Sequence, residues 1–165
     1  MDIKLKRTPP PLKHLAHPWH FLSFGFGSGY SPWAPGTAGT VAAIPIFYFM
    51  ASLSLWSYLL LVFVMTMLGF YICGYTTRAL GKHDHSAIVW DEIVGYLITM
   101  LAMPNTWQWM LIGFFVFRIF DVVKPWPINV IDRRISGGLG IMLDDVLAGV
   151  FGIVVMQGLF HYFGG

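Results

Sequence analysis

Residues 141–163 read IMLDDVLAGVFGIVVMQGLFHYF, an apolar run that two acids, Asp144 and Asp145, interrupt near its start. The run exceeds the ~20 apolar residues that a helix needs to cross the hydrocarbon core of a bilayer. Four more apolar runs precede it, at 38–54, 55–75, 88–103 and 107–124. The sequence therefore predicts an all-α integral membrane protein, a bundle of about five transmembrane helices. Four crossings with one half-buried segment is the alternative, because 38–54 and 88–103 are short.

The composition of the chain indicates the same class of protein. Its 165 residues are 56% hydrophobic and 11% charged, with a mean hydropathy of +0.66, which would leave a soluble domain with too little polar surface. The first 20 residues are rich in Lys and Pro and lack the compact apolar core and cleavage site of a signal peptide. We predict a cytoplasmic N-terminal arm over residues 1–20 and a single transmembrane helical domain over 21–165.

The charged residues can all be placed on one side of a membrane. If each run crosses once, the links near Ser52 and Asn105 and the C-terminus carry no Lys, Arg, Asp or Glu. The opposite side collects Lys4, Lys6, Arg7, Lys13, Arg78, Lys82, Lys124, Arg133 and Arg134, with Arg118 just inside a helix end. The positive-inside rule places that side in the cytoplasm. Anionic lipid headgroups are the expected neighbours of such a surface, and nucleic acid is not an expected partner.

Most of the acidic residues fall on that same side. They are Asp84, Asp91, Glu92, Asp121, Asp132, Asp144 and Asp145. Carboxylates gathered so closely would repel one another unless cations lay between them, so we predict a metal-dependent site at the inner membrane face. Capping of helix N-termini is the structural alternative for the two adjacent acid pairs.

Small residues share the helix faces of two of these acids. Steps of four and eight residues lead from Asp91 to Gly95 and Thr99, and the face of Asp145 includes Ala148, Gly149 and Gly152. Small residues let neighbouring helices approach closely. Both acids are therefore predicted to point into the bundle.

A glycine-rich stretch, GFGSGYSPWAPGTAGT, occupies residues 25–40. Its glycines allow successive N–H groups to point at one anion, and a helix that starts near Thr37 would add its positive dipole end. This pattern predicts a phosphate cradle that includes Gly36 and Thr37. An interfacial turn shaped by Gly and Pro is the alternative.

Cationic residues near the fourth run could bind an anionic headgroup. In RIFDVVK, at 118–124, Arg118 and Asp121 lie on nearly the same helix face. Arg118 therefore either binds phosphate through its planar guanidinium or is neutralised by Asp121. Lys124, Arg133 and Arg134 flank a short stiff loop and suit a headgroup, although the two arginines also fit an orientation signal.

Four blocks, GFGSGYSPWAPGT, HDHSAIVWDE, FRIFDVVKPWP and GGLGIMLDDVLAG, resemble in the same order the bacterial phosphatidylglycerophosphatase A family. The resemblance covers about residues 18–160. It implies a multi-pass enzyme of the inner membrane that uses Mg²⁺ to convert phosphatidylglycerophosphate to phosphatidylglycerol and phosphate. It also implies that Asp91, Glu92, Asp144 and Asp145 bind the metal and act in catalysis, with Asp121 as a further catalytic candidate.

The residues leave other possibilities open. A small cation transporter would use the same acids, but a pathway needs polar groups across the bilayer, and the outer halves of the runs are uncharged. For the phosphatase, a metal-activated water is the predicted nucleophile and an aspartyl-phosphate is the alternative. Cys73 is the single cysteine, which excludes an internal disulfide. The oligomeric state stays open.

Overall fold

The computed structural model describes residues 10–81 and 85–163, and this part of the chain is entirely helical or irregular. The prediction of an all-α protein is confirmed. The helices are η1 (Leu12–Ala16), α1 (Pro18–Ser23), η2 (Gly25–Tyr30), α2 (Pro35–Met50), α3 (Leu55–Leu80), α4 (Trp90–Thr99), α5 (Trp107–Val123), α6 (Ile128–Arg134) and α7 (Gly137–Phe163). Lys4, Lys6, Arg7, Lys82 and Asp84, which the sequence places on the cytoplasmic side, lie outside the described residues.

The five apolar runs correspond to five helices of very different length. α3, with 26 residues, and α7, with 27, are long and apolar enough to cross a membrane, and α2 is a shorter apolar helix. α4 has 10 residues, so it rises about 15 Å, roughly half of the ~30 Å hydrocarbon thickness. A bundle of five full crossings is therefore not confirmed, because α4 is too short to cross alone.

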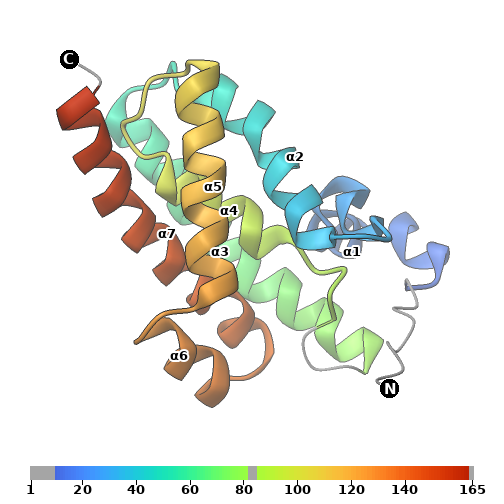
Figure 1. Cartoon of the computed structure of the whole chain (residues 1–165). Helices are drawn as coiled ribbons and strands as arrows, with labels where there is room; N and C mark the ends of the chain where they lie inside the picture. Colours follow the sequence, from blue (N-terminus) through green and yellow to red (C-terminus); the bar gives the residue numbers. More distant parts are fainter. Residues whose placement is uncertain (1–9, 82–84, 164–165) are drawn as a thin grey trace.

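α4 lies in the middle of the bundle, packed against α2, α3, α5 and α7 (Figure 1). Tyr58 donates a hydrogen bond of 2.6 Å to the carbonyl of Leu97, and Tyr96 donates one of 3.1 Å to the carbonyl of Met110. The first of these satisfies a carbonyl in the last turn of α4, which has no partner within the helix. Four large side chains of α4 are wholly buried in the core: Ile93, Val94, Tyr96 and Leu97.

Local signals set the helix ends that matter for the site. Pro35 stands at the start of α2, where its missing N–H costs nothing. Ser54 caps α3 by accepting a hydrogen bond from the Ser57 amide at 3.3 Å, and Gly81 ends the helix with a φ of 62°. Lys124 ends α5 with a φ of 44°, a conformation that non-glycine residues adopt rarely.

α4 and α7 approach each other through the small residues that the sequence places beside Asp91 and Asp145. A Cβ atom on Gly149 would lie 2.7 Å from the carbonyl oxygen of Gly95. One on Gly152 would lie 2.5 Å from the hydroxyl of Thr99. The predicted close approach of these two faces is confirmed.

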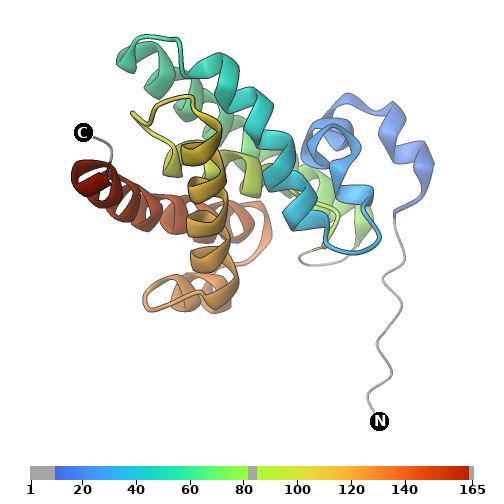
Figure 2. The same ribbon diagram turned by 45° about the horizontal axis from the view of Figure 1, so that its top comes forward.

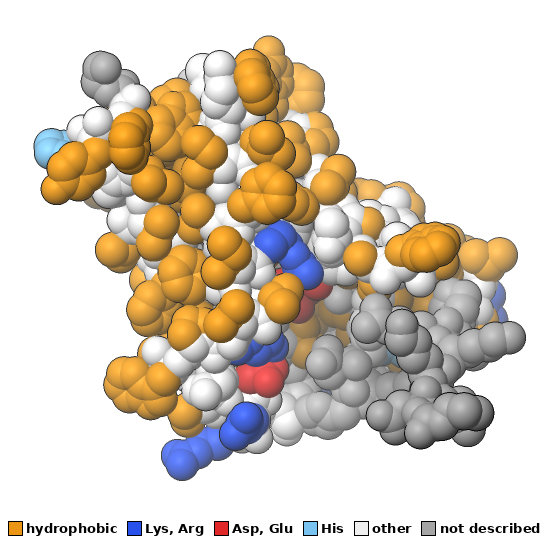
Figure 3. Space-filling view, in the orientation of Figure 1, with side chains coloured by type: hydrophobic (Ala, Val, Ile, Leu, Met, Phe, Trp, Pro, Cys, Tyr) orange, Lys and Arg blue, Asp and Glu red, His pale blue; other side chains and the backbone are white. Residues whose placement is uncertain are grey.

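The two ends of the bundle differ in character. The α2–α3 link, the α4–α5 link and the C-terminal end of α7 lie together at one end, whereas α6 and the start of α7 lie at the other (Figures 1 and 2). On the face shown in Figure 3, charged side chains occupy the middle and lower part, and the upper part is mostly hydrophobic. The described charges on this face thus gather toward the end that holds α6.

The N-terminal helices dock on α3, where α1 carries a buried histidine. His20 is 5% exposed, and its Nδ1 lies 2.9 Å from the hydroxyl of Thr76. The rings of His14 and His17 lie 4.9 and 5.0 Å from the His20 ring, centroid to centroid. Burial first, and then the two neighbouring histidines, lower the pKa of His20 below its ordinary value of 6.5.

We expect Gly149→Ala to lower the thermal unfolding temperature and Gly158→Ala to leave it unchanged or raise it. Alanine is favoured over glycine in a helix by ~1 kcal/mol, so a loss at residue 149 must come from collision with α4, where overpacking costs ~1–3 kcal/mol. A Cβ on Gly158 has no neighbour within 4 Å, which makes it the matched control in the same helix. Thermal unfolding of the two purified variants in detergent measures this. A higher unfolding temperature for Gly149→Ala would contradict the close contact.

We also expect the chain to lose stability as the pH falls below about 6.5, the ordinary pKa from which that of His20 is lowered. The unfolded chain then binds a proton at His20 more readily than the folded chain does, which favours unfolding. Denaturant unfolding of wild type and His20→Gln, each above and below this pH, isolates the contribution. Equal losses in both proteins would show that His20 does not titrate as the structure indicates.

Candidate functional site

A cavity of about 560 Å³ opens where the N-terminal parts of α2, α4 and α7 meet the C-terminal end of α5 and helix α6. It brings together ten of the eleven residues that the sequence analysis assigns to the site: Gly36, Thr37, Asp91, Glu92, Arg118, Asp121, Lys124, Arg133, Asp144 and Asp145. The eleventh, Arg134, is exposed at the end of α6 and does not line the cavity.

Three carboxylates form the most compact cluster in this cavity. Asp91, Glu92 and Asp145 each offer one oxygen, and these oxygens lie within 4.8 Å of one another. We refer to them as the carboxylate triad. One oxygen of each, Asp91 Oδ1, Glu92 Oε2 and Asp145 Oδ2, is buried without a hydrogen-bond partner among the described residues. Three charges so close repel unless a cation lies between them, and an all-oxygen donor set suits Mg²⁺ or Mn²⁺.

Helix capping does not account for Asp144 and Asp145. α7 begins at Gly137 rather than near residue 141, so Asp144 and Asp145 lie about two turns inside the helix, beyond the region that a cap or the helix dipole favours. They are nevertheless 6% and 3% exposed, respectively. Asp91 and Glu92 do stand in the first turn of α4, where the helix dipole favours acids, so the capping alternative stays open for these two. The triad is therefore not explained by the helix ends alone.

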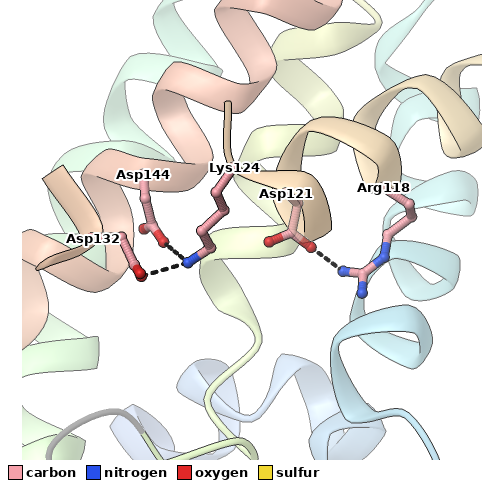
Figure 4. Close-up of polar contacts among 5 residues, drawn as sticks. All are labelled: Arg118, Asp121, Lys124, Asp132 and Asp144. Carbon is pink, nitrogen blue, oxygen red and sulfur yellow. Dashed lines mark hydrogen bonds and ion pairs between the residues drawn. The ribbon is translucent and has the colours of Figure 1, made fainter. Parts of the chain in front are cut away.

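The other carboxylates of the cavity are paired with cations, as Figure 4 shows. Arg118 Nη1 donates to Asp121 Oδ2. Lys124 Nζ donates to Asp132 Oδ1 at 2.5 Å and to Asp144 Oδ2 at 2.6 Å. Burial lowers the pKa of Lys124, but its hydrogen bonds with the two carboxylates outweigh burial and raise that pKa above its ordinary range. Lys124 is thus a fixed positive charge at neutral pH.

Asp132 belongs to the acids that the sequence gathers on one side, but the sequence predicts no individual role for it in the site. It lines the cavity from α6, together with Trp33, Ser86 and Ser136 from other segments. The signal that could have found it is its place in the Asp-Arg-Arg sequence, eight residues after Lys124. Sequence spacing alone does not reveal that Lys124 turns toward Asp132 rather than toward solvent.

The start of α2 forms another wall of the cavity. Trp33 to Thr37 line it, whereas the glycines at 25, 27 and 29 do not, so only the end of the glycine-rich stretch belongs to the site. A Cβ atom on Gly36 would collide with Glu92 Oε1 and lie 3.1 Å from Arg118 Nη1. The backbone amides of the first turn have no acceptor within the helix, and the dipole end favours anions. Gly36, one of the two residues of the predicted anion cradle, thus lies beside both Arg118 and the triad.

Comparison with known proteins reveals close relatives over nearly the whole chain. A family model described as Phosphatidylglycerophosphatase A matches residues 21–160. A protein of Escherichia coli named Phosphatidylglycerophosphatase A is 48% identical over 149 residues, which cover 90% of this chain and 87% of the relative. One of the same name from Haemophilus influenzae is 43% identical over 150 residues, covering 88% and 92%.

A third relative carries a different name. A protein of Bacteroides thetaiotaomicron, provisionally named phosphatidylinositol-3-phosphatase, is 41% identical over 143 residues, which cover 82% of this chain and 89% of the relative. No solved structure matches the chain significantly. All three relatives are thus named as phosphatases of phosphorylated lipids.

Proposed function

The chain belongs to the phosphatidylglycerophosphatase A family, and we propose that it hydrolyses the terminal phosphate of phosphatidylglycerophosphate to give phosphatidylglycerol and phosphate. The resemblance of its sequence motifs to that family is confirmed. The chain is accordingly a phosphatase. One observation carries the substrate class: a triad of unpaired carboxylates, two cations and a helix N-terminus converge on a single cavity.

The proposal includes Mg²⁺ as cofactor, with Asp91, Glu92 and Asp145 as the residues that would hold it. The partnerless buried oxygens of the triad support this assignment, since a charged oxygen is costly to bury without a partner. When bound, such an ion would activate a water for attack and offset charge on the phosphoryl oxygens. Asp144, the fourth predicted ligand, is hydrogen-bonded to Lys124.

The remaining groups of the cavity would bind and orient the phosphate. Arg118 presents a planar guanidinium that suits two phosphoryl oxygens, and Lys124 a compact charge on the opposite side of Asp121 (Figure 4). The amides of Gly36 and Thr37 would donate to the same anion. Phosphoryl transfer depends chiefly on such positioning and charge neutralisation, because little covalent chemistry falls to the protein. Arg133, on the cavity rim, would contact the rest of the headgroup.

We further propose that the chain is a multi-pass protein of the bacterial inner membrane with this cavity at the cytoplasmic face. α3 and α7 are long enough to cross, and large apolar side chains on three helices are exposed, among them Phe63, Phe115 and Val154. On the face shown in Figure 3, the described charges gather toward one end of the bundle, which is consistent with a positive-inside orientation. α4 would then be a half-length segment enclosed by the other helices, with membrane lipids around them.

The alternative of a cation transporter is not favoured. The named relatives are enzymes. Within the described residues, the partnerless carboxylates lie in one cavity rather than in a series through the bundle. A pathway for ions would need polar groups along its whole length.

Phosphate release from phosphatidylglycerophosphate by the detergent-purified protein tests the proposal. We expect release that requires Mg²⁺, is abolished by excess chelator and falls by about 100-fold or more in Asp91→Asn and Asp145→Asn, since several kcal/mol of transition-state stabilisation depend on the ion. Gly158→Ala is the control for handling and folding. A folded protein that releases no phosphate with any divalent metal would contradict the assigned activity. A phosphorylated aspartate trapped with hydroxylamine would exclude direct attack by water.

Gly36→Ala tests the wall that α2 contributes. The added methyl group would collide with Glu92 and crowd Arg118, so we expect kcat/KM to fall by about tenfold or more while the unfolding temperature changes little, because the collision involves side-chain ends at the cavity. Gly74→Ala is a suitable control, since its Cβ would meet no atom closer than 3.6 Å. Equal activities of the two variants would show that the start of α2 does not form part of the site.

A further inference from the structure

The ion pairs of the cavity divide its acids into two sets. Six carboxylates and three cationic side chains line it. Three of the carboxylates, Asp121, Asp132 and Asp144, are in ion pairs with Arg118 or Lys124. The other three are the carboxylate triad, which has no ion pair within the described chain. Asp144 Oδ1 is also buried without a hydrogen-bond partner, but Asp144 already has Lys124 as its cation. The acids of the cavity that have no ion pair among the described residues are thus the three that lie together.

Lys124 occupies a position built for a cation. Its ammonium group donates hydrogen bonds to Asp132 of α6 and Asp144 of α7, and its backbone ends α5. Three elements therefore meet at this group (Figure 4). Its φ of 44° is unfavourable for a residue with a side chain. A flexible lysine on a surface loop requires neither this backbone conformation nor two carboxylates. The arrangement holds the ammonium at a defined point of the cavity.

The same contacts separate Asp144 from the triad. Asp144 directly precedes Asp145 in α7, yet no oxygen of Asp144 joins the group of three that lie within 4.8 Å of one another. Its Oδ2 instead accepts a hydrogen bond from Lys124 at 2.6 Å. A divalent ion ligated by Asp144 and Asp132 would have to displace Lys124, because two cations cannot share one pair of carboxylates without strong repulsion.

We propose that the site binds one divalent cation, at the triad, and that the ammonium of Lys124 is the second positive charge that the phosphate meets, held there by Asp132 and Asp144. This inference rests on the proposed function. Asp132 and Asp144 are then positioning residues for Lys124 rather than ligands of the ion. Asp144 is then not one of the four metal ligands that the sequence resemblance implies. Asp132 belongs to the site as a residue that positions Lys124.

Binding of Mn²⁺ to the purified full chain tests the proposal without reference to turnover. Electron paramagnetic resonance of free Mn²⁺ counts the bound ions. We expect one tightly bound Mn²⁺ per chain in wild type, Lys124→Arg, Asp132→Asn and Asp144→Asn, and none in Asp145→Asn. In Lys124→Met the two released carboxylates should accept a second Mn²⁺, detected as a doubled stoichiometry with a spectrum broadened by coupling between the ions.

Two readouts of activity accompany the count. Phosphate release should rise with free Mn²⁺ with a Hill coefficient near one in wild type. Asp132→Asn and Asp144→Asn should raise KM or lower kcat by about tenfold or more with unchanged Mn²⁺ affinity, since the ammonium loses its position. Lys124→Arg should recover more activity than Lys124→Met. A folding defect would instead lower Mn²⁺ binding in the same variants.

The outcomes separate this inference from the proposed function. Two Mn²⁺ in wild type, loss of the ion in Asp144→Asn, or a single ion in folded Lys124→Met would each overturn the inference, whatever the activity. One Mn²⁺ with the expected pattern of variants, but no release of phosphate from the lipid, would support the inference and contradict the function. No bound Mn²⁺ in wild type would overturn both the inference and the assigned cofactor.

Discussion

The close passage of α4 over α7 is the constraint on which the site depends. At Gly95 and Gly149 the two backbones leave no room for side chains. Because Asp91 lies one turn before Gly95 and Asp145 one turn before Gly149, this contact brings acids that are more than fifty positions apart into one cluster. Larger residues at the crossing would move the helices apart by the size of a side chain, and the three carboxylates of the triad would no longer lie close together. Packing and chemistry are therefore coupled through two glycines.

The second constraint is the neutralisation of the carboxylates that lie around this contact. Buried carboxylates are costly unless they are paired or hold a cation, and the acids of this cavity divide between those that have an ion pair and those that have none. Arg118 and Lys124 neutralise Asp121, Asp132 and Asp144. The triad on α4 and α7 keeps partnerless oxygens, as does Asp144 at Oδ1. The starts of α2 and α4 add positive dipole ends. The cavity therefore offers oxygen donors for the proposed divalent cation and positive groups for the proposed phosphate.

Much of this architecture can be predicted from the sequence because hydrophobic periodicity and the distribution of charges along the chain are local properties. Each apolar run coincides with a helix, and ten of the proposed site residues line one cavity. The failures have physical causes. The apolar run 88–103 is nearly long enough to cross a membrane. Its last residues form a turn instead of helix, because α4 ends at Thr99. Gly25 to Gly29 resemble a phosphate loop, yet they pack against residues 87–93 instead of lining the cavity.

By itself, the sequence determined the helical class, the positions of the apolar segments and the residue types available for metal and phosphate. These follow from composition and spacing along one helix, which the folded chain does not alter. Only the tertiary structure decided which acids meet. Asp144 and Asp145 are neighbours in sequence, but a rotation of ~100° per residue directs one toward Lys124 and the other toward α4. That division depends on which helix packs on each face, and no local pattern contains this information.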